Sequence, residues 1–209
     1  MTTRIKICGI TRHEDAMMCI GNGVDALGLV FYPPSPRNLS VMQARSILSG
    51  LPPFITIVAL FMNPSREEVE QVLSDCRIDR LQFHGSEDGR FCEQFGFPYY
   101  KAVAMGDGVQ DFQQLQKEYA NSSAFLLDSH RRDQAGGSGQ SFDWAMIPDD
   151  IDRPVILAGG LSPDNVQSAI RQIRPYAVDC SSAVESEPGI KDPIKVRQFV
   201  ENVQYVSTT

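Results

Sequence analysis

Two side chains follow apolar runs directly and belong to types that transfer protons. Cys8 ends the run 5–8 and precedes Gly9, and Asp128 ends the run 124–128. A thiolate can remove a proton from carbon, and a carboxyl group beside apolar residues can hold a proton near neutral pH. Each also has a purely structural interpretation, because free cysteines are often buried as small hydrophobes and aspartates often order their own loops.

Two later turns have the residue types of a phosphate site. Gly159 and Gly160 follow the run 154–158, and the sequence Ser181-Ser182-Ala183 comes shortly after the run 176–179. Glycines allow close backbone approach, and free N–H groups at the start of a helix attract anions. A tight turn that binds no ligand could also contain the pair Gly159-Gly160. The first turn alone is therefore no evidence for a phosphate site, and only the two turns together favour one.

Further polar side chains lie at other strand ends or between strands. Arg37 follows three prolines that restrict its loop, and its guanidinium is suited to a carboxylate, although a solvated surface arginine is the alternative. His84 follows the run 80–83 and contacts either a substrate or a neighbouring loop. Lys6 shares a strand face with Cys8, and Asp179 is the expected partner of its ammonium group. We expect this positive charge to lower the pKa of Cys8.

Strands and helices alternate along the chain that carries these residues. Strand-like runs occur at 5–8, 26–31, 55–61, 80–83, 99–104, 124–128, 154–158 and 176–179. The first helix is predicted to start at a capping box formed by residues Thr11 to Glu14. The other helical segments are predicted at 41–48, 66–73, 87–95, 109–119, 142–147, 163–173 and 193–203. The expected caps are Ser40, Ser65, Ser86, Ser162 and Asp192.

Eight such units in 209 residues favour an α/β protein with one (β/α)8 barrel domain over residues 1–209. An open doubly wound sheet usually has five or six strands. In a barrel the active site lies at the C-terminal ends of the strands, where the residues described above stand. The loops after the seventh and eighth strands are then neighbours and form one phosphate site.

Composition restricts the class of protein. The chain has 42% hydrophobic residues and a net charge of −7, without a long apolar run or a charged leader, so we expect a soluble cytoplasmic protein that binds neither membrane nor nucleic acid. Five scattered cysteines predict no disulfide framework, and three histidines far apart in sequence indicate no metal site. A small anionic substrate is compatible with this charge, and the protein is expected to be a monomer or a homodimer.

The strand ends together resemble those of the phosphoribosylanthranilate isomerase family of tryptophan biosynthesis. The resemblance runs from the first strand to the last helix and rests on these segments: 6–11 (KICGIT), 28–32 (GLVFY), 35–37 (SPR), 81–85 (LQFHG), 126–128 (LLD), 136–139 (GGSG), 142–144 (FDW), 159–161 (GGL), 178–185 (VDCSSAVE) and 188–192 (PGIKD). It implies an Amadori rearrangement of N-(5-phosphoribosyl)anthranilate to 1-(o-carboxyphenylamino)-1-deoxyribulose 5-phosphate, without a cofactor.

The resemblance also implies roles for individual residues. Asp128 is expected to be the general acid and Cys8 the general base, and Arg37 is suited to the anthranilate carboxylate. The other expected substrate-binding residues are His84, Gly137, Gly139 and Asp179, and the expected phosphate-binding residues are Gly159, Gly160, Ser181, Ser182 and Ala183. Ala183 stands where the family usually has glycine, which raises the question of whether the backbone there needs an angle that only glycine adopts readily.

Two other functions remain open at this point. One is another phosphosugar isomerase of the histidine-pathway type, although that family has an aspartate where this chain has Cys8. The other is a barrel that binds a phosphate ligand without catalysis, which would keep the glycine turns but would not need Cys8 or Asp128.

Overall fold

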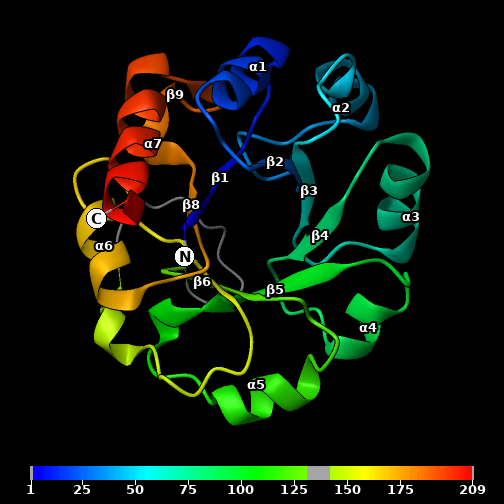
Figure 1. Cartoon of the computed structure of the whole chain (residues 1–209). Helices are drawn as coiled ribbons and strands as arrows, with labels where there is room; N and C mark the ends of the chain where they lie inside the picture. The colour runs from blue at the N-terminus through cyan, green and yellow to red at the C-terminus, as the bar shows by residue number, and fades with distance from the viewer. Residues whose placement is uncertain (1, 131–141, 209) are drawn as a thin grey trace.

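A computed structural model describes residues 2–130 and 142–208, and its strands form a closed parallel barrel surrounded by helices (Figure 1). The barrel strands, in order around the ring, are β1 (Arg4–Cys8), β2 (Ala26–Phe31), β3 (Thr56–Phe61), β4 (Arg80–Phe83), β5 (Tyr99–Ala104), β6 (Phe125–Asp128), β7 (Val155–Leu157) and β8 (Ala177–Cys180). All eight predicted strands form, and β2, β4 and β5 have the predicted bounds. The predicted barrel is therefore confirmed.

The α-helices lie outside this ring, and among the described residues one follows each strand except β6, which is followed by a 3-10 turn. They are α1 (His13–Gly21), α2 (Val41–Leu48), α3 (Arg66–Asp75), α4 (Gly89–Glu93), α5 (Phe112–Glu118), α6 (Val166–Ile173) and α7 (Pro193–Thr208). The described residues also contain the short 3-10 helices η1 (Met105–Asp107), η2 (Trp144–Met146) and η3 (Ser182–Val184). Ser40 and Ser65 form the predicted caps of α2 and α3, each with a full capping box, and Asp192 accepts hydrogen bonds at the start of α7.

The predicted capping box at Thr11 is wrong. The first helix begins at His13, and its N-cap residue Arg12 makes no side-chain cap. The Thr11 hydroxyl instead donates to the carbonyl of Gly189, 178 residues further along the chain. A contact with a distant segment has replaced the local one, which sequence spacing cannot reveal.

Three further helices are shorter than predicted because other residues cap them. Asp88, not Ser86, accepts the backbone N–H of Phe91, so α4 begins at Gly89. The segment 142–147 contains only the 3-10 turn η2, and α5 begins after Asp111. The cap residues are Asp88, Asp143 and Asp111, and aspartate caps a helix at least as well as serine does.

The turn before α6 also differs from the prediction. Asn165, not Ser162, occupies the N-cap position. Its side chain accepts from the Ser162 N–H at 2.8 Å and donates to the Gly160 carbonyl at 2.8 Å. Ser162 therefore belongs to a hydrogen-bonded turn that holds the glycine pair after β7, and not to the helix.

A two-stranded antiparallel hairpin, β9 (Glu185–Glu187) and β10 (Ile190–Lys191), follows β8 and was not predicted. Strands of three and two residues are too short to give a periodic sequence signal. The hairpin matters for function because it carries Glu185 and Lys191, which are both buried.

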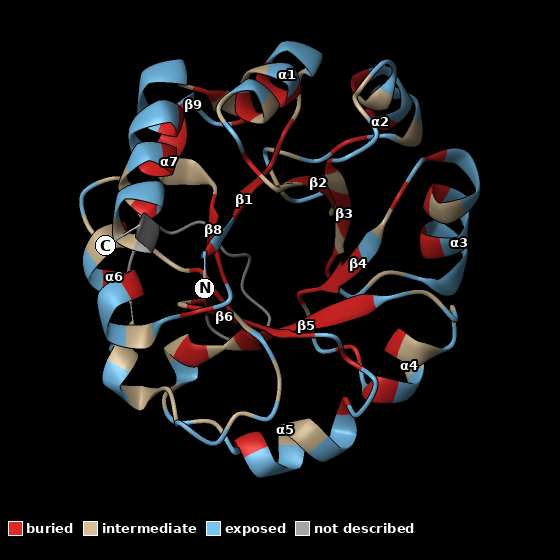
Figure 2. Ribbon diagram, in the orientation of Figure 1, coloured by how far each residue is buried: buried red, intermediate tan, exposed pale blue. Residues whose placement is uncertain are grey.

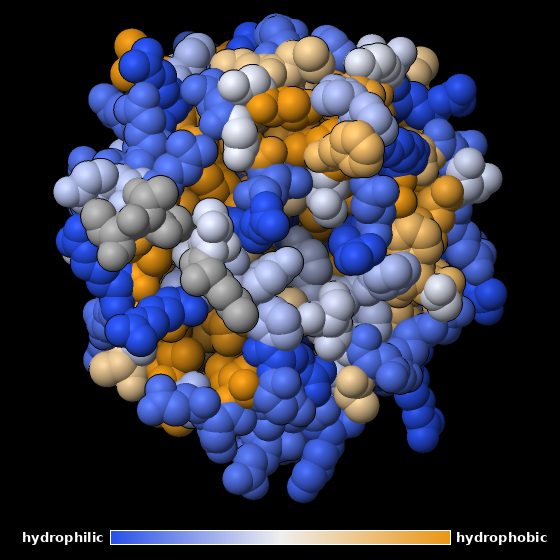
Figure 3. Space-filling model, viewed as in Figure 1, coloured by the Kyte–Doolittle hydropathy of each residue, from blue (hydrophilic) through white to orange (hydrophobic). Residues whose placement is uncertain are grey.

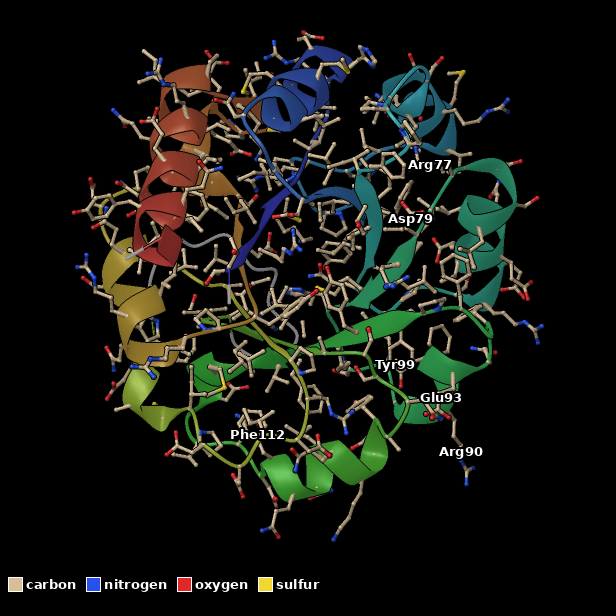
Figure 4. All side chains as sticks on the ribbon, viewed as in Figure 1. Arg77, Asp79, Arg90, Glu93, Tyr99 and Phe112 are labelled. Carbon is tan, nitrogen blue, oxygen red and sulfur yellow. The ribbon has the colours of Figure 1, made fainter. Side chains whose placement is uncertain are left out.

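Burial follows the two layers of the barrel. The strands are buried along most of their length, and the helices are exposed on the sides that face away from the ring (Figure 2). The rim of the face in Figure 3 is mainly hydrophilic. Phe112 of α5 points toward the barrel and packs edge-on against Phe125, whereas Arg90 of α4 points away from it (Figure 4). Among the described helices, none combines the length and apolar character that a membrane crossing needs.

Candidate active site

A cavity of about 100 Å³ opens at the C-terminal ends of the strands. Ten of the predicted site residues line it, and they come from both ends of the chain: Cys8, Arg37, His84, Asp128, Gly159, Gly160, Asp179, Ser181, Ser182 and Ala183. The other two predicted residues, Gly137 and Gly139, lie outside the described residues. Segments far apart in sequence thus converge on one pocket.

Cys8 lies at the end of β1 beside Gly28, its register partner on β2. A Cβ atom added to Gly28 would be 2.6 Å from the Cys8 sulfur, so the absence of a side chain there leaves space for the thiol. Burial raises the pKa of Cys8, and the nearby Lys6 ammonium opposes this rise without overcoming it. The predicted influence of Lys6 is present, but Cys8 in the protein itself is a protonated thiol at neutral pH.

Beneath the thiol, the expected Lys6–Asp179 ion pair is confirmed. Lys6 Nζ is 2.6 Å from Asp179 Oδ2, and the two side chains are only 4% and 8% exposed. Asp179 Oδ1 has no hydrogen-bond partner among the described residues, and Asp179 lines the pocket. Burial raises the pKa of Asp179, and Lys6 acts in the opposite direction. This carboxylate oxygen is thus a buried acceptor without a partner among the described residues.

Asp128 lies at the end of β6 between two histidine rings. Its Oδ2 is 3.6 Å from His84 Nε2 and 3.7 Å from His130 Nδ1, and the backbone N–H of His130 donates to Oδ1 at 3.3 Å. Burial alone would raise the pKa of Asp128, but the histidines outweigh it and lower the pKa to about 2. The expectation that Asp128 holds a proton near neutral pH is therefore wrong for the protein by itself.

His84 and His130 are brought together although they are 46 positions apart, and their ring centroids are 4.2 Å apart. Burial and the neighbouring His130 lower the pKa of His84 to about 3, so this ring is neutral at physiological pH. With Asp128 they place three possible ligand atoms within 4.8 Å of one another. Sequence spacing indicated no such cluster, and His130 was missed as a site residue.

Arg37 reaches the pocket, as predicted, and one edge of its guanidinium is held by Glu185. Nε and Nη2 donate to the two carboxylate oxygens at 2.8 and 2.6 Å. Lys191 Nζ lies 2.7 Å from the same carboxylate and is completely buried. Burial would raise the pKa of Glu185, but Arg37 and Lys191 hold it below its usual value. The hairpin thereby orients Arg37, a role that sequence reasoning did not find.

The two turns predicted for phosphate meet at one side of the pocket. Gly159 and Gly160 have φ angles of +74° and +67°, which favour glycine. Ser181 donates its hydroxyl to the Cys8 carbonyl at 3.0 Å and thus ties the turn after β8 to the end of β1. Ala183 is not among the described residues with a positive φ, so its backbone does not require glycine.

Comparisons with known proteins agree with this geometry. Residues 5–202 match the model of a family described as N-(5'phosphoribosyl)anthranilate (PRA) isomerase. A protein of Stutzerimonas stutzeri named N-(5'-phosphoribosyl)anthranilate isomerase is 51% identical over 203 residues, which cover 97% of this chain and 98% of that protein.

Two solved structures are similar over nearly their whole length. A phosphoribosyl anthranilate isomerase from Thermus thermophilus superposes with a TM-score of 0.88 at 35% identity, covering 98% of this chain and 100% of that one. Another, solved in complex with reduced 1-(o-carboxyphenylamino)-1-deoxyribulose 5-phosphate, has a TM-score of 0.83 at 37% identity and covers 97% and 99% of the two chains.

Proposed function

This chain belongs to the N-(5'-phosphoribosyl)anthranilate isomerase family and isomerises that phosphosugar in tryptophan biosynthesis, and we propose that Asp128 and Cys8 are the acid and the base of the reaction. The observation that carries the proposal is that both side chains line one pocket with Arg37 and the turns after β7 and β8. A histidine-pathway isomerase has an aspartate where this chain has Cys8, and a non-catalytic barrel would need neither Cys8 nor Asp128.

The reaction needs proton transfer at two separate atoms. Asp128 protonates the furanose oxygen, the C1–O bond breaks, and a Schiff base forms between C1 and the anthranilate nitrogen. Cys8 then removes the proton from C2 to give an enolamine, which tautomerises to the ketone. Because β1 and β6 lie at different places around the ring, one group can face the oxygen while the other faces the carbon.

Both groups begin in the protonation state opposite to the one they need. The pKa of Asp128 is low and that of Cys8 is high, so the protein by itself holds a carboxylate and a thiol. A substrate with a phosphate and a carboxylate brings negative charge and displaces water, and both effects raise the pKa of Asp128. Cys8 loses its thiol proton to the solution before it accepts the proton from C2, and the Lys6 ammonium favours this ionisation.

The remaining residues hold the substrate. Arg37 binds the anthranilate carboxylate with the part of its guanidinium that Glu185 leaves available. Asp179 Oδ1, which lacks a partner among the described residues, accepts a sugar hydroxyl. His84 lies against the substrate beside Asp128, and Gly137 and Gly139, which are outside the described residues, are further proposed substrate-binding residues.

The phosphate occupies the place where the turns after β7 and β8 meet. Gly159 and Gly160 offer backbone N–H groups from the first turn, and Ser181, Ser182 and Ala183 form the second. We also propose that residues 1–209 form a single domain, active as a monomer or a homodimer. The five unpaired cysteines support a place in the reducing cytoplasm.

Turnover of freshly prepared phosphoribosylanthranilate, followed by loss of the anthranilate-type fluorescence, tests this proposal. We expect Asp128→Asn and Cys8→Ser each to lower kcat about 100- to 10,000-fold, the usual contribution of acid–base catalysis, with a much smaller change in KM. A variant with near-wild-type turnover would remove that residue from its role. Substrate binding without turnover by the wild-type protein would favour a non-catalytic barrel instead.

A further inference from the structure

His84 has a single proton to place on its two ring nitrogens, and the choice decides what it offers to Asp128. We infer that Tyr100 and Gln82 are positioning residues that lock the proton of His84 on Nε2, so that this ring points an N–H group at the Asp128 carboxylate from 3.6 Å, just beyond hydrogen-bond distance. The inference rests on the proposed role of Asp128 as the acid. It concerns Gln82, which lines the pocket, and Tyr100, which is not among the lining residues.

The hydrogen bond between Gln82 and His84 determines the tautomer. Gln82 Nε2 is 3.0 Å from His84 Nδ1, and Gln82 is 1% exposed. An amide nitrogen can only donate, so His84 Nδ1 must accept. A neutral imidazole that accepts at Nδ1 carries its proton at Nε2, and Nε2 is the atom that faces Asp128 at 3.6 Å.

Tyr100 fixes the orientation of the Gln82 amide. Its hydroxyl donates to Gln82 Oε1 at 3.0 Å. If the amide were turned over, its NH2 group would face Tyr100, and the tyrosine oxygen would have to accept. Gln82 Oε1 is the acceptor that the described residues offer this hydroxyl, and Tyr100 is buried, so a turned-over amide would leave the phenol proton without a partner. The tyrosine proton therefore points toward Gln82.

These contacts form one directed chain across the interior of the barrel. Tyr100 donates to Gln82, and Gln82 donates to His84 Nδ1, which leaves the Nε2–H of His84 facing Asp128. We call this chain the Tyr100–His84 relay. Both steps have their donor on the Tyr100 side, so turning the Gln82 amide over would disturb both of its hydrogen bonds. Such a disturbance is costly in a buried position.

The relay has a chemical consequence for ring opening. A donor beside a carboxylate stabilises the conjugate base of an acid, so His84 helps Asp128 release its proton as the C1–O bond breaks. Burial keeps His84 neutral, so its N–H dipole stabilises the Asp128 carboxylate without making His84 a competing acid.

The same lock explains why the cluster is poorly suited to a cation. Two imidazoles and one carboxylate within 4.8 Å resemble the ligand set of several divalent transition metals. A metal needs the lone pair of His84 Nε2, where the relay places a proton. Binding would require Gln82 to turn over against Tyr100.

Tyr100→Phe is the cleanest test, because Tyr100 is not among the residues that line the pocket. Long-range proton–nitrogen correlation spectra of protein with isotope-labelled histidine report the tautomer, and the His84 signals are assigned by their loss in His84→Asn. We expect the Nε2–H form in the wild type and a mixture of both forms in Tyr100→Phe. The kcat of that variant should fall about 2- to 12-fold, the range of one neutral hydrogen bond, with little change in KM.

The neighbouring Tyr99 provides a matched control. It points out of the barrel toward α4, where its hydroxyl lies 3.5 Å from Glu93 Oε1 (Figure 4). Tyr99→Phe removes a core hydroxyl of the same kind and should leave the His84 tautomer and kcat unchanged. Gln82→Glu should reverse the tautomer, because a carboxylate accepts from Nδ1–H and leaves Nε2 without a proton.

Several results would overturn the inference. A wild-type spectrum with the proton on Nδ1 would do so without any variant, even if Tyr100→Phe failed to fold. A loss of kcat in Tyr100→Phe without a change in the tautomer would mean that Tyr100 acts through packing. Since the spectra require no turnover, they separate failure of the relay from failure of the role of Asp128.

Discussion

Replacing Lys6 with methionine tests the electrostatic core beneath the site. The Lys6→Met variant leaves Asp179 buried, with an 8% exposed side chain, and removes the partner that lies 2.6 Å from Oδ2. Removing one member of a buried ion pair typically costs about 3–5 kcal/mol of unfolding free energy. For a chain of this size each kcal/mol lowers Tm by about 2–4 °C, so we expect a loss of about 6–20 °C at pH 7.

The loss should depend on pH with a definite sign. Without Lys6, burial raises the pKa of Asp179 still further above its value of about 4 in the unfolded chain. A carboxyl group whose pKa is higher in the folded than in the unfolded protein destabilises the fold at pH values above the unfolded-state pKa. Below that pKa the group is protonated in both states and the penalty disappears. The difference in Tm between variant and wild type should therefore shrink as the pH falls from 7 toward 4.

Thermal unfolding followed by circular dichroism at several pH values measures this difference, and the pH profile of Cys8 alkylation should move to higher pH in the same variant. Arg4→Met is the matched control, since Arg4 on the same strand pairs with Asp25 at 2.8 Å but is 58% exposed. An exposed pair contributes about 0–1 kcal/mol. A Tm deficit that does not change with pH, or an unchanged alkylation profile, would refute the reasoning.

Three further changes probe the pocket. Gly28→Ala places a methyl group 2.6 Å from the Cys8 sulfur, so we expect a stability loss of about 1–3 kcal/mol by chemical unfolding and a lower kcat; normal values of both would mean that the thiol has room to move. Arg37→Ala should raise KM for the substrate more than it lowers kcat, and an unchanged KM would contradict its role with the carboxylate. Arg37 and Lys191 outweigh burial and lower the pKa of Glu185 in the folded protein. The ionised carboxylate therefore stabilises the fold at pH values above its unfolded-state pKa of about 4.3. This stabilisation is lost as the pH falls through the lower folded-state pKa. Glu185→Gln should therefore reduce Tm more at pH 7 than at pH 3, and an equal loss at both pH values would contradict this.

The sequence predicted the parts of the fold that depend on local patterns. Apolar runs placed every barrel strand to within two residues at either end, and strand ends located Cys8 and Asp128 at the same mouth. The pairing of Lys6 with Asp179 followed from strand alternation and from the closure of the barrel, which makes the first and eighth strands neighbours. These inferences needed no knowledge of side-chain geometry.

Contacts between distant segments were beyond such reasoning. Arg37 and Glu185 are 148 positions apart, and the hairpin that brings them together is too short to have a periodic signal. His130 follows Asp128 by two residues, but its stacking on His84 depends on how neighbouring loops fold. The two histidines lower the pKa of Asp128. The apolar strand before Asp128 had suggested a raised pKa, so the direction expected from the sequence was wrong.

The central claim is that Asp128 opens the ring and Cys8 removes the proton from C2. The most direct test uses substrate deuterated at C2 of the sugar. The isotope effect on kcat is measured for the wild type, for Cys8→Ser and for Asp128→Asn. Cys8→Ser should show a larger primary effect than the wild type, because proton removal becomes rate-limiting, and Asp128→Asn should show a smaller one, because ring opening does. Equal isotope effects in the two variants, or the opposite order, would contradict the division of roles between these residues.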